Sequence, residues 1–330
     1  MTAQGIRRQC VVFVVAALSV AAANAAPSAT TAAKPATAGN HDMVLIPAGP
    51  FIMGSDKRET GTQSKEYGSK KPWYVDEHPQ RQVTLPAFYL DRYEVAYSEY
   101  RRFLSAKQFA DNLTPETWKQ NGYVLSEPGL RQAPVEALRN IAVEIFQVTG
   151  DVRAMEKDAV IVAIMAKQHA MDNWPVSGVT WFAARDYCQW RGARLPTEQE
   201  WEKSARGDNG HEYPWGEQWD QARLNAGGGE KEWEQGVAPI GSYPQGASPF
   251  GVHDLAGNVM EWVADWYQPY PGGDYQSKAF GEQYKVVRGG GWGGIGHYAI
   301  THFYRSAYRF YLDPRSTFVD LGFRCAADAK

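Results

Sequence analysis

The chain has no excess of charge of one sign, because 34 Lys and Arg residues face 37 Asp and Glu residues and give a formal charge of −3. This balance excludes a protein that works through a strongly basic phosphate-binding surface, so we expect no nucleic-acid partner. Beyond the N-terminus no apolar run is long enough to cross a bilayer, so we expect no membrane span in the mature form. Glycine (32), proline (19) and tryptophan (12) are abundant and favour a turn-rich, irregular fold over a helix bundle.

Residues 1–25 have the pattern of an export signal peptide. Arg7 and Arg8 precede an apolar run that ends at Ala23, and small residues follow at the cleavage positions. The run is shorter than the roughly 20 apolar residues of a spanning helix, which makes a membrane anchor the weaker alternative. Residues 26–40 contain no large apolar side chain and predict a disordered linker. We therefore expect a periplasmic or secreted protein whose folded domain covers residues 41–330.

Cysteine is scarce, with three residues in the whole chain. Cys10 would leave with the signal peptide, so the mature protein would keep only Cys188 and Cys325. Two thiols in an oxidising compartment are most simply a disulfide, and two unrelated buried thiols are the alternative.

Short strands are expected at the start of the domain. Residues 43–54 predict two strands about a Pro/Gly turn, residues 81–85 predict an edge strand, and residues 88–95 predict another strand. The polar stretch 54–80 between them predicts a surface loop. A helix is expected to begin at Tyr97.

Residues 110–172 differ in character from the rest and predict a helical insertion. Apolar residues at helical spacing in 134–147 and 152–171 indicate a helical hairpin. The stretch 160–165 is apolar all round, so it must pack on the main domain or on a partner protein. Ordinary core helices are the simpler alternative. Farther along, 180–191 predicts a helix, and Thr197 with Glu200 predicts a capping box that starts another.

Several segments together resemble the formylglycine-generating enzyme family, also called sulfatase-modifying factors. They are Met43–Gly49 with Met53-Gly54, Trp174–Trp181, Arg194–Glu202, Tyr213–Gly216, Asp254–Trp262, Arg288–Trp292, Arg305–Arg309 and Gly322–Cys325. The resemblance spans residues 43–328 and is interrupted mainly by the insertion. It implies an α+β, C-type-lectin-like fold with much irregular structure. Cys188 and Cys325 fall where the family commonly places a structural disulfide.

The resemblance also implies a structural calcium site in the segment 254–261. The side chains of Asp254 and Glu261 and the carbonyls of Gly257 and Val259 would supply the hard oxygen ligands that calcium prefers. An ordinary hydrogen-bonded turn is the alternative. A second calcium site of the family would begin near Asn225.

The chain departs from the family's oxidases at their catalytic centre. Those enzymes convert a protein cysteine to formylglycine with copper held by two cysteine thiolates, and the corresponding interval here, 291–304, contains no cysteine. Because Cu(I) selects thiolate ligands, copper is not expected. Met260 also replaces an aromatic residue of the family's motif.

Histidine and aromatic residues stand in that interval instead. His297 and His302 could be metal ligands or a proton-transfer pair, and with Tyr304 they are the candidate catalytic residues. A metal would need a third ligand, such as Asp313 or a carboxylate of the insertion. The alternative is an aromatic pocket lining with solvated histidines. The candidate substrate-binding residues are Trp262, Trp292, Tyr298 and Arg305.

Two functions of different classes fit these residues. One is an exported oxidoreductase, similar to a cysteine-less periplasmic branch of the family that acts in peptide siderophore maturation, which would modify a peptide or peptide-derived substrate oxidatively. The other is a noncatalytic, calcium-stabilised module that binds a peptide, a glycan or a partner protein. Arg288, Arg305 and Arg309 could clamp a substrate carboxylate or could brace irregular loops by bonding groups of the chain itself.

Overall fold

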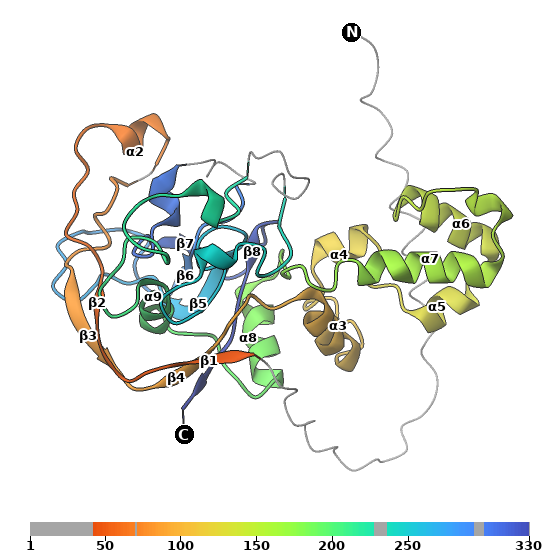
Figure 1. The fold of residues 1–330 in the computed structure, drawn as a ribbon, viewed down its shortest axis with the longest axis horizontal. Helices are drawn as coiled ribbons and strands as arrows, with labels where there is room; N and C mark the ends of the chain where they lie inside the picture. Colours follow the sequence, from red (N-terminus) through yellow and green to blue (C-terminus); the bar gives the residue numbers. More distant parts are fainter. Residues whose placement is uncertain (1–41, 70, 228–235, 294–299, 330) are drawn as a thin grey trace, which may run out of the picture. The chain divides into compact units, whose positions relative to one another are not determined.

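The computed structural model describes residues 42–69, 71–227, 236–293 and 300–329 (Figure 1). Contacts divide them into two compact units, one formed by residues 108–172 and the other by the described residues before and after that segment. No helix among the described residues is both long enough and apolar enough to cross a membrane.

The two ends of the larger unit meet in one sheet. β1 (Met43–Ile46) pairs with β4 (Phe88–Asp91), and β4 pairs on its other side with β9 (Ala326–Asp328), both antiparallel. β2 (Gly49–Met53) instead pairs with β3 (Arg81–Leu85). The predicted strands are therefore confirmed, except that β4 ends at Asp91, four residues before the predicted end. The two strands at the Pro/Gly turn pair with later strands, not with each other.

A four-stranded sheet in the order β7-β6-β5-β8 carries the C-terminal motifs. Its strands are β5 (Met260–Trp266), β6 (Lys285–Arg288), β7 (Phe310–Leu312) and β8 (Leu321–Gly322). β5 runs antiparallel to β6 and parallel to β8. Trp201 and Ala205 of helix α9 (Glu198–Arg206) are buried in one cluster with Val263 and Val286 of this sheet.

Three helices accompany the sheets of this unit: α3 (Tyr97–Ala106), α8 (Trp181–Trp190) and α9 (Glu198–Arg206). The hydroxyl of Thr180 accepts a hydrogen bond from the Ala183 amide and caps α8. The predicted capping box of α9 is confirmed, because Thr197 and Glu200 each accept the other's backbone N–H.

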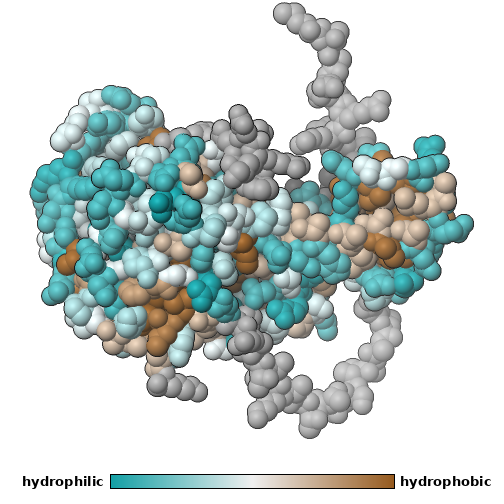
Figure 2. All heavy atoms as spheres, viewed as in Figure 1, coloured by the Kyte–Doolittle hydropathy of each residue, from teal (hydrophilic) through white to brown (hydrophobic). Residues whose placement is uncertain are grey.

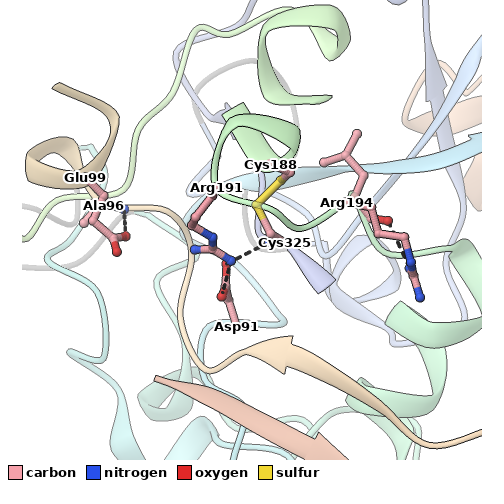
Figure 3. The surroundings of a disulfide bond; sticks show 8 residues. Asp91, Ala96, Glu99, Cys188, Arg191, Arg194 and Cys325 are labelled. Carbon is pink, nitrogen blue, oxygen red and sulfur yellow. Dashed lines mark hydrogen bonds and ion pairs between the residues drawn. A yellow bond between two sulfur atoms is a disulfide. The ribbon is translucent and has the colours of Figure 1, made fainter. Parts of the chain in front are cut away.

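A disulfide joins α8 to the segment before β9. Cys188 and Cys325 are bonded at 1.97 Å across 137 positions of the sequence, which confirms the predicted pair. Figure 3 shows Arg191 and Asp91 beside it. The Arg191 guanidinium donates to both Asp91 oxygens at 2.6 and 2.7 Å, and the Cys325 amide donates to Asp91 at 2.9 Å. The bond therefore lies in a buried polar frame.

The smaller unit is helical and has its own core. Its elements are α4 (Glu116–Gln120), α5 (Glu127–Gln132), α6 (Val135–Glu144), the 3-10 turn η1 (Val152–Ala154) and α7 (Lys157–His169). Leu138 and Ile141 of α6 pack with Val160 and Ile164 of α7. α7 begins five residues later than predicted, because Asp151 caps the 3-10 turn and Glu156 has extended backbone angles.

Short elements complete the larger unit. They are α2 (Gln63–Glu66), η2 (Gln221–Arg223), η4 (Pro244–Gly246) and η5 (Thr301–Tyr304).

Candidate functional site

The candidate site lies where the Arg-Gly-Gly segment after β6 meets η5. Gly290 has a φ of 67°, in the left-handed region that favours glycine. A Cβ atom at this position would come within 2.9 Å of both the Phe303 carbonyl oxygen and the Tyr304 ring. Glycine therefore allows the η5 backbone to approach the segment closely. His297 and Tyr298 lie outside the described residues.

His302 is held inside an aromatic surrounding. Only 3% of its surface is exposed, and its ring stacks on Trp73 with a centroid distance of 4.3 Å and an interplanar angle of 8°. Its Nδ1 has no hydrogen-bond partner among the described residues. Burial, with smaller contributions from Arg305 and Lys71, lowers the pKa of His302 to about 2. The imidazole is therefore neutral at pH 7 and can accept a hydrogen bond or bind a metal, but it is too weak a base to remove a proton efficiently.

Trp73 belongs to a segment that we call the strap, residues 54–69 and 71–80. The sequence predicted a surface loop here, and this prediction is wrong for the middle of the strap. Asp76 and Glu77 are 3% and 0% exposed. Lys71 forms a buried ion pair with Asp76. The Tyr74 and His302 rings are nearly perpendicular, with a centroid distance of 4.8 Å. The strap thus packs against η5 and supplies part of the site.

Arg305 ties the strap to the segment after η5. Its two terminal nitrogens donate to the two Glu77 oxygens at 2.7 and 2.9 Å, and its Nε donates to Glu212 at 2.5 Å. The side chain is buried. Because all three guanidinium nitrogens bind carboxylates of the chain itself, Arg305 braces the site in this structure. Its role in substrate binding stays a prediction.

Tyr304, two residues after His302, lies in an aromatic cluster. Its ring packs on Trp219 with a centroid distance of 5.5 Å. The Trp219 ring packs on Tyr213, and Tyr213 stacks on Trp215, with centroid distances of 5.6 and 5.3 Å. The two tryptophans are only partly buried. Burial, with Asp320 nearby, raises the pKa of the Tyr304 phenol, so its hydroxyl stays protonated at neutral pH. The cluster offers partly exposed aromatic surface for a ligand.

The two tryptophans predicted to bind substrate differ in exposure. Trp262 is fully buried in β5, and its indole N–H donates to the Val179 carbonyl at 3.0 Å, which places it in the framework behind the site. Trp292 is half-buried, and its backbone amide donates to the Asn258 carbonyl at 2.9 Å. This bond connects the candidate site to the predicted calcium turn.

The predicted calcium turn is close-packed. Gly257 has a φ of 80°, and a Cβ atom there would come within 2.4 Å of the Asn225 carbonyl oxygen. The Oδ2 atom of Asp254 accepts a hydrogen bond from the Gly241 amide at 2.7 Å. The Val259 amide donates to the carboxylate of Glu94, a residue that the sequence analysis did not single out.

Negative charge exceeds positive charge around this turn. Glu94, Asp254 and Glu261 are all buried, and Arg324, the arginine among them, donates to both oxygens of Glu261. Burial, and then the charges of Asp254 and Glu261, raise the pKa of Glu94 well above its usual value. Burial and the Glu261 charge raise the pKa of Asp254 to about 6. A buried surplus of carboxylates fits a bound cation, which would relieve their repulsion.

Asn225 turns its side chain toward the same region. Its amide nitrogen donates to the Gly236 carbonyl at 2.8 Å and to the Asn258 side chain at 3.2 Å. The neighbouring residues 228–235 lie outside the described residues, so the second calcium site stays a prediction.

Within the described ranges no group of three or more His, Cys, Asp or Glu side chains is arranged to hold a metal ion.

A separate pocket of 310 Å³ opens between α8, the segment before α9 and β5. Trp181, Leu195 and Ala264 supply apolar walls, and Arg185 and Arg194 lie at the same pocket. Behind Trp181, the ammonium of Lys285 sits over the Trp181 and Trp266 rings at 4.0 and 3.7 Å. This pocket was not predicted from the sequence, because its lining residues are scattered over 84 positions and come together only in the fold.

A model of the sulfatase-modifying factor enzyme 1-like domain matches residues 28–329. The chain belongs to this family. The predicted resemblance is therefore confirmed, and so is the mixed helix-and-sheet fold that it implied.

Curated relatives in this sulfatase-modifying factor family include proteins of different activity. Inactive C-alpha-formylglycine-generating enzyme 2 of Bos taurus is 30% identical over 296 residues, covering 87% of this chain and 88% of that protein. Formylglycine-generating enzyme of Bos taurus is 32% identical over 311 residues, covering 87% and 74%. Hercynine oxygenase of Mycolicibacterium smegmatis is 31% identical over 280 residues, covering 79% of this chain and 56% of that protein.

Among solved structures, PvdO from Pseudomonas aeruginosa is similar in fold. The two structures have a TM-score of 0.55 and 22% sequence identity, and the match covers 87% of this chain and 94% of PvdO.

Proposed function

We propose that this sulfatase-modifying factor family member binds a peptide or peptide-derived substrate beside η5 and oxidises it without a copper–dithiolate centre. The reaction would remove two hydrogens from the substrate and pass two electrons and two protons to dioxygen, which becomes hydrogen peroxide. Two relatives named above support this reaction class, since one is named as an oxygenase and one generates formylglycine. The neutral His302 imidazole would accept a hydrogen bond from the substrate, and Tyr304 would donate one.

The observation that carries the proposal is the state of His302. Packing on Trp73 and the nearby cations Arg305 and Lys71 keep the imidazole neutral, and its Nδ1 has no partner among the described residues. A buried nitrogen without a partner costs about 1–3 kcal/mol, and a substrate group that donates to Nδ1 would recover that cost. Cys188 and Cys325 bind each other and offer no thiolate, so the redox centre would need other ligands.

Export and calcium complete the proposal. A periplasmic or secreted location is supported by the Cys188–Cys325 disulfide, which persists in oxidising compartments. Calcium would be held by the side chains of Asp254 and Glu261 with the carbonyls of Gly257 and Val259, and it would stabilise the turn that contacts Trp292.

Calcium binding is tested by thermal unfolding of the purified mature chain. Calcium should raise the melting temperature of the wild type relative to EDTA and should have little effect on Asp254→Asn. Magnesium serves as the control ion, because it demands a tighter octahedral shell. A wild type that melts at the same temperature in calcium and in EDTA would argue for an ordinary turn.

The enzymatic proposal is tested by activity and by metal content. The mature chain is incubated in air with cysteine-containing and tyrosine-containing peptides, and mass spectrometry follows the loss of two hydrogens while an electrode follows oxygen uptake. His302→Phe keeps the ring stack on Trp73 but removes both nitrogens, so it should fold and lose the reaction. His169→Ala, an exposed histidine of α7, is the matched control and should keep it.

Metal analysis then separates the two function classes. A transition metal bound by the wild type and lost in both His297→Ala and His302→Ala would assign the redox centre to these histidines. Calcium as the only metal, with no oxygen uptake and no peptide modified, would reject the enzymatic proposal.

The second candidate function is a noncatalytic binding module. The pocket beside Trp181 favours it, because a concave apolar site with a few polar groups at its edge is typical of ligand binding. The relative named as inactive is consistent with such a role. Peptide binding by isothermal titration that is lost in a pocket-filling Ala264→Trp variant, without any oxidation, would support it.

A further inference from the structure

α7 is apolar on two faces, and the smaller unit covers only one of them. Val160, Ile161 and Ile164 are at most 1% exposed and belong to the core of this unit. On the opposite face Val162 is 66% exposed, and Ala159 and Ala166 are exposed as well. The sequence predicted that 160–165 must pack on the main domain or on a partner. Within the described residues the outer face of α7 stays open.

Figure 2 shows this face as an apolar band between hydrophilic borders. Burying an exposed valine against a partner surface would stabilise the contact by about 25 cal/mol per Å² of apolar area removed from water. Alanines on both sides of Val162 allow another helix backbone to come close.

We propose that the outer face of α7 binds the same face of a second copy of this chain, as an antiparallel helix pair about a twofold axis. A closed twofold contact uses one patch twice, so the patch must be complementary to itself. α7 meets this condition. With the axis between Val162 and Ala163, Ala159 lies opposite Ala166 of the second copy, and Val162 lies opposite its Ala163.

The charges beside the apolar face are also self-complementary. Glu156 precedes the first turn of α7 and Lys167 lies in its last turn, and both are exposed. At 100° per residue the two side chains project from the same flank of the helix. In an antiparallel pair each flank faces the equivalent flank, so Glu156 of each copy lies near Lys167 of the other. In a parallel twofold pair opposite flanks would face each other, so Glu156 of one copy would not meet Lys167 of the other.

The expected contact is small. A 13-residue helix is about 20 Å long, and one face of it buries less than the roughly 1,200–2,000 Å² of a standard interface. The dimer should therefore form and dissociate with concentration in the micromolar range. Its test needs a method that measures this equilibrium directly.

Analytical ultracentrifugation of the full mature chain tests the proposal between about 5 and 300 µM. The wild type should show a monomer–dimer equilibrium, and Val162→Lys should stay monomeric throughout. Val143→Lys is the matched control, because Val143 is 47% exposed on α6 and lies outside the α7 face. Circular dichroism checks that each exposed-site variant keeps the helical content of the wild type.

Charge exchange then tests the antiparallel orientation. Glu156→Lys and Lys167→Glu should each raise the dissociation constant about tenfold, because each places like charges opposite one another twice. The double variant restores both pairs and should return to within about threefold of the wild type. A monomeric wild type, a Val143→Lys effect as large as that of Val162→Lys, or a double variant as weak as the singles would overturn the proposal.

Discussion

At the scale of single residues, buried arginines hold the irregular loops together. Arg309 donates to both oxygens of Glu198, and Arg288 binds Glu198 at 3.0 Å and Glu202 at 2.7 Å. These side chains are almost fully buried. Of the two roles considered for the arginines, the contacts show the bracing one, because acids of the same chain occupy the guanidinium edges.

Glu202 is a second acid on which this bracing converges. It accepts hydrogen bonds from Arg288, from Arg206 at 2.9 Å and from the Gly54 amide at 2.7 Å. Glu202→Ala leaves two buried guanidiniums without this carboxylate and should lower the free energy of unfolding by about 3–5 kcal/mol. Urea denaturation measures the loss.

An exposed ion pair provides the comparison for this variant. Glu127 binds Arg131 at 2.7 Å on α5, where both side chains are about half exposed. Glu127→Ala should cost no more than about 0.5 kcal/mol, because water screens exposed pairs. Equal losses in the two variants would mean that the buried network contributes no special stability.

His302 predicts a pH dependence of stability. Its pKa is about 2 in the folded chain because of burial and the nearby cations, while an unfolded histidine has a pKa of about 6.5. The unfolded state therefore binds one proton more than the folded state below about pH 6.5. Stability should fall as the pH drops from about 6.5 to 4.5, and His302 should contribute up to about 1.4 kcal/mol per pH unit.

His302→Phe removes this titration and keeps a ring against Trp73. Its free energy of unfolding should therefore fall less steeply with acid than that of the wild type. The difference in slope should correspond to the uptake of about one proton on unfolding. Phe303→Leu, a packing change in the same turn without a titrating group, should keep the wild-type slope. Parallel curves for the wild type and His302→Phe would show that the histidine is protonated in the folded chain.

At the scale of elements, capping decides where α9 begins. The Thr197 hydroxyl accepts the Glu200 amide at 3.2 Å, and Glu200 accepts the Thr197 amide at 2.8 Å. Thr197→Ala should lower the free energy of unfolding by about 1 kcal/mol, whereas Thr197→Ser keeps the acceptor and should cost little. Thermal unfolding distinguishes them, and an equally destabilised serine variant would point to the threonine methyl group instead of the cap.

Elements with local signals were predictable from the sequence, and the strap was not. α8 and α9 carry caps and periodic apolar residues, so their positions followed from adjacent residues. The strap is polar, and Asp76 and Glu77 are buried only because Lys71 and Arg305 neutralise them. Arg305 lies more than 200 positions away, so no local pattern reports the pairing. The aromatic contact between Trp73 and His302 was missed for the same reason.

At the scale of the whole molecule, the family motifs indicated a candidate region but not its chemical state. His302, Tyr304 and Arg305 all follow the Arg-Gly-Gly segment, and their roles in function stay predictions. Sequence could not show that Arg305 is hydrogen-bonded to Glu77 and Glu212, or that Glu94 lies beside the acidic turn. Burial and charge balance depend on the assembled fold, so no local motif reports them.

The disulfide should act on the stability of the larger unit as a whole. It joins α8 to the end of the chain across 137 positions, so its loss frees a long loop in the unfolded state. The paired variant Cys188→Ala with Cys325→Ala should lower the free energy of unfolding by about 2–5 kcal/mol, measured by urea denaturation without reductant. Dithiothreitol should destabilise the wild type by a similar amount and should leave the paired variant unchanged. A wild type that is insensitive to reductant, in a sample whose free thiols confirm reduction, would assign its stability to the buried ion pairs instead.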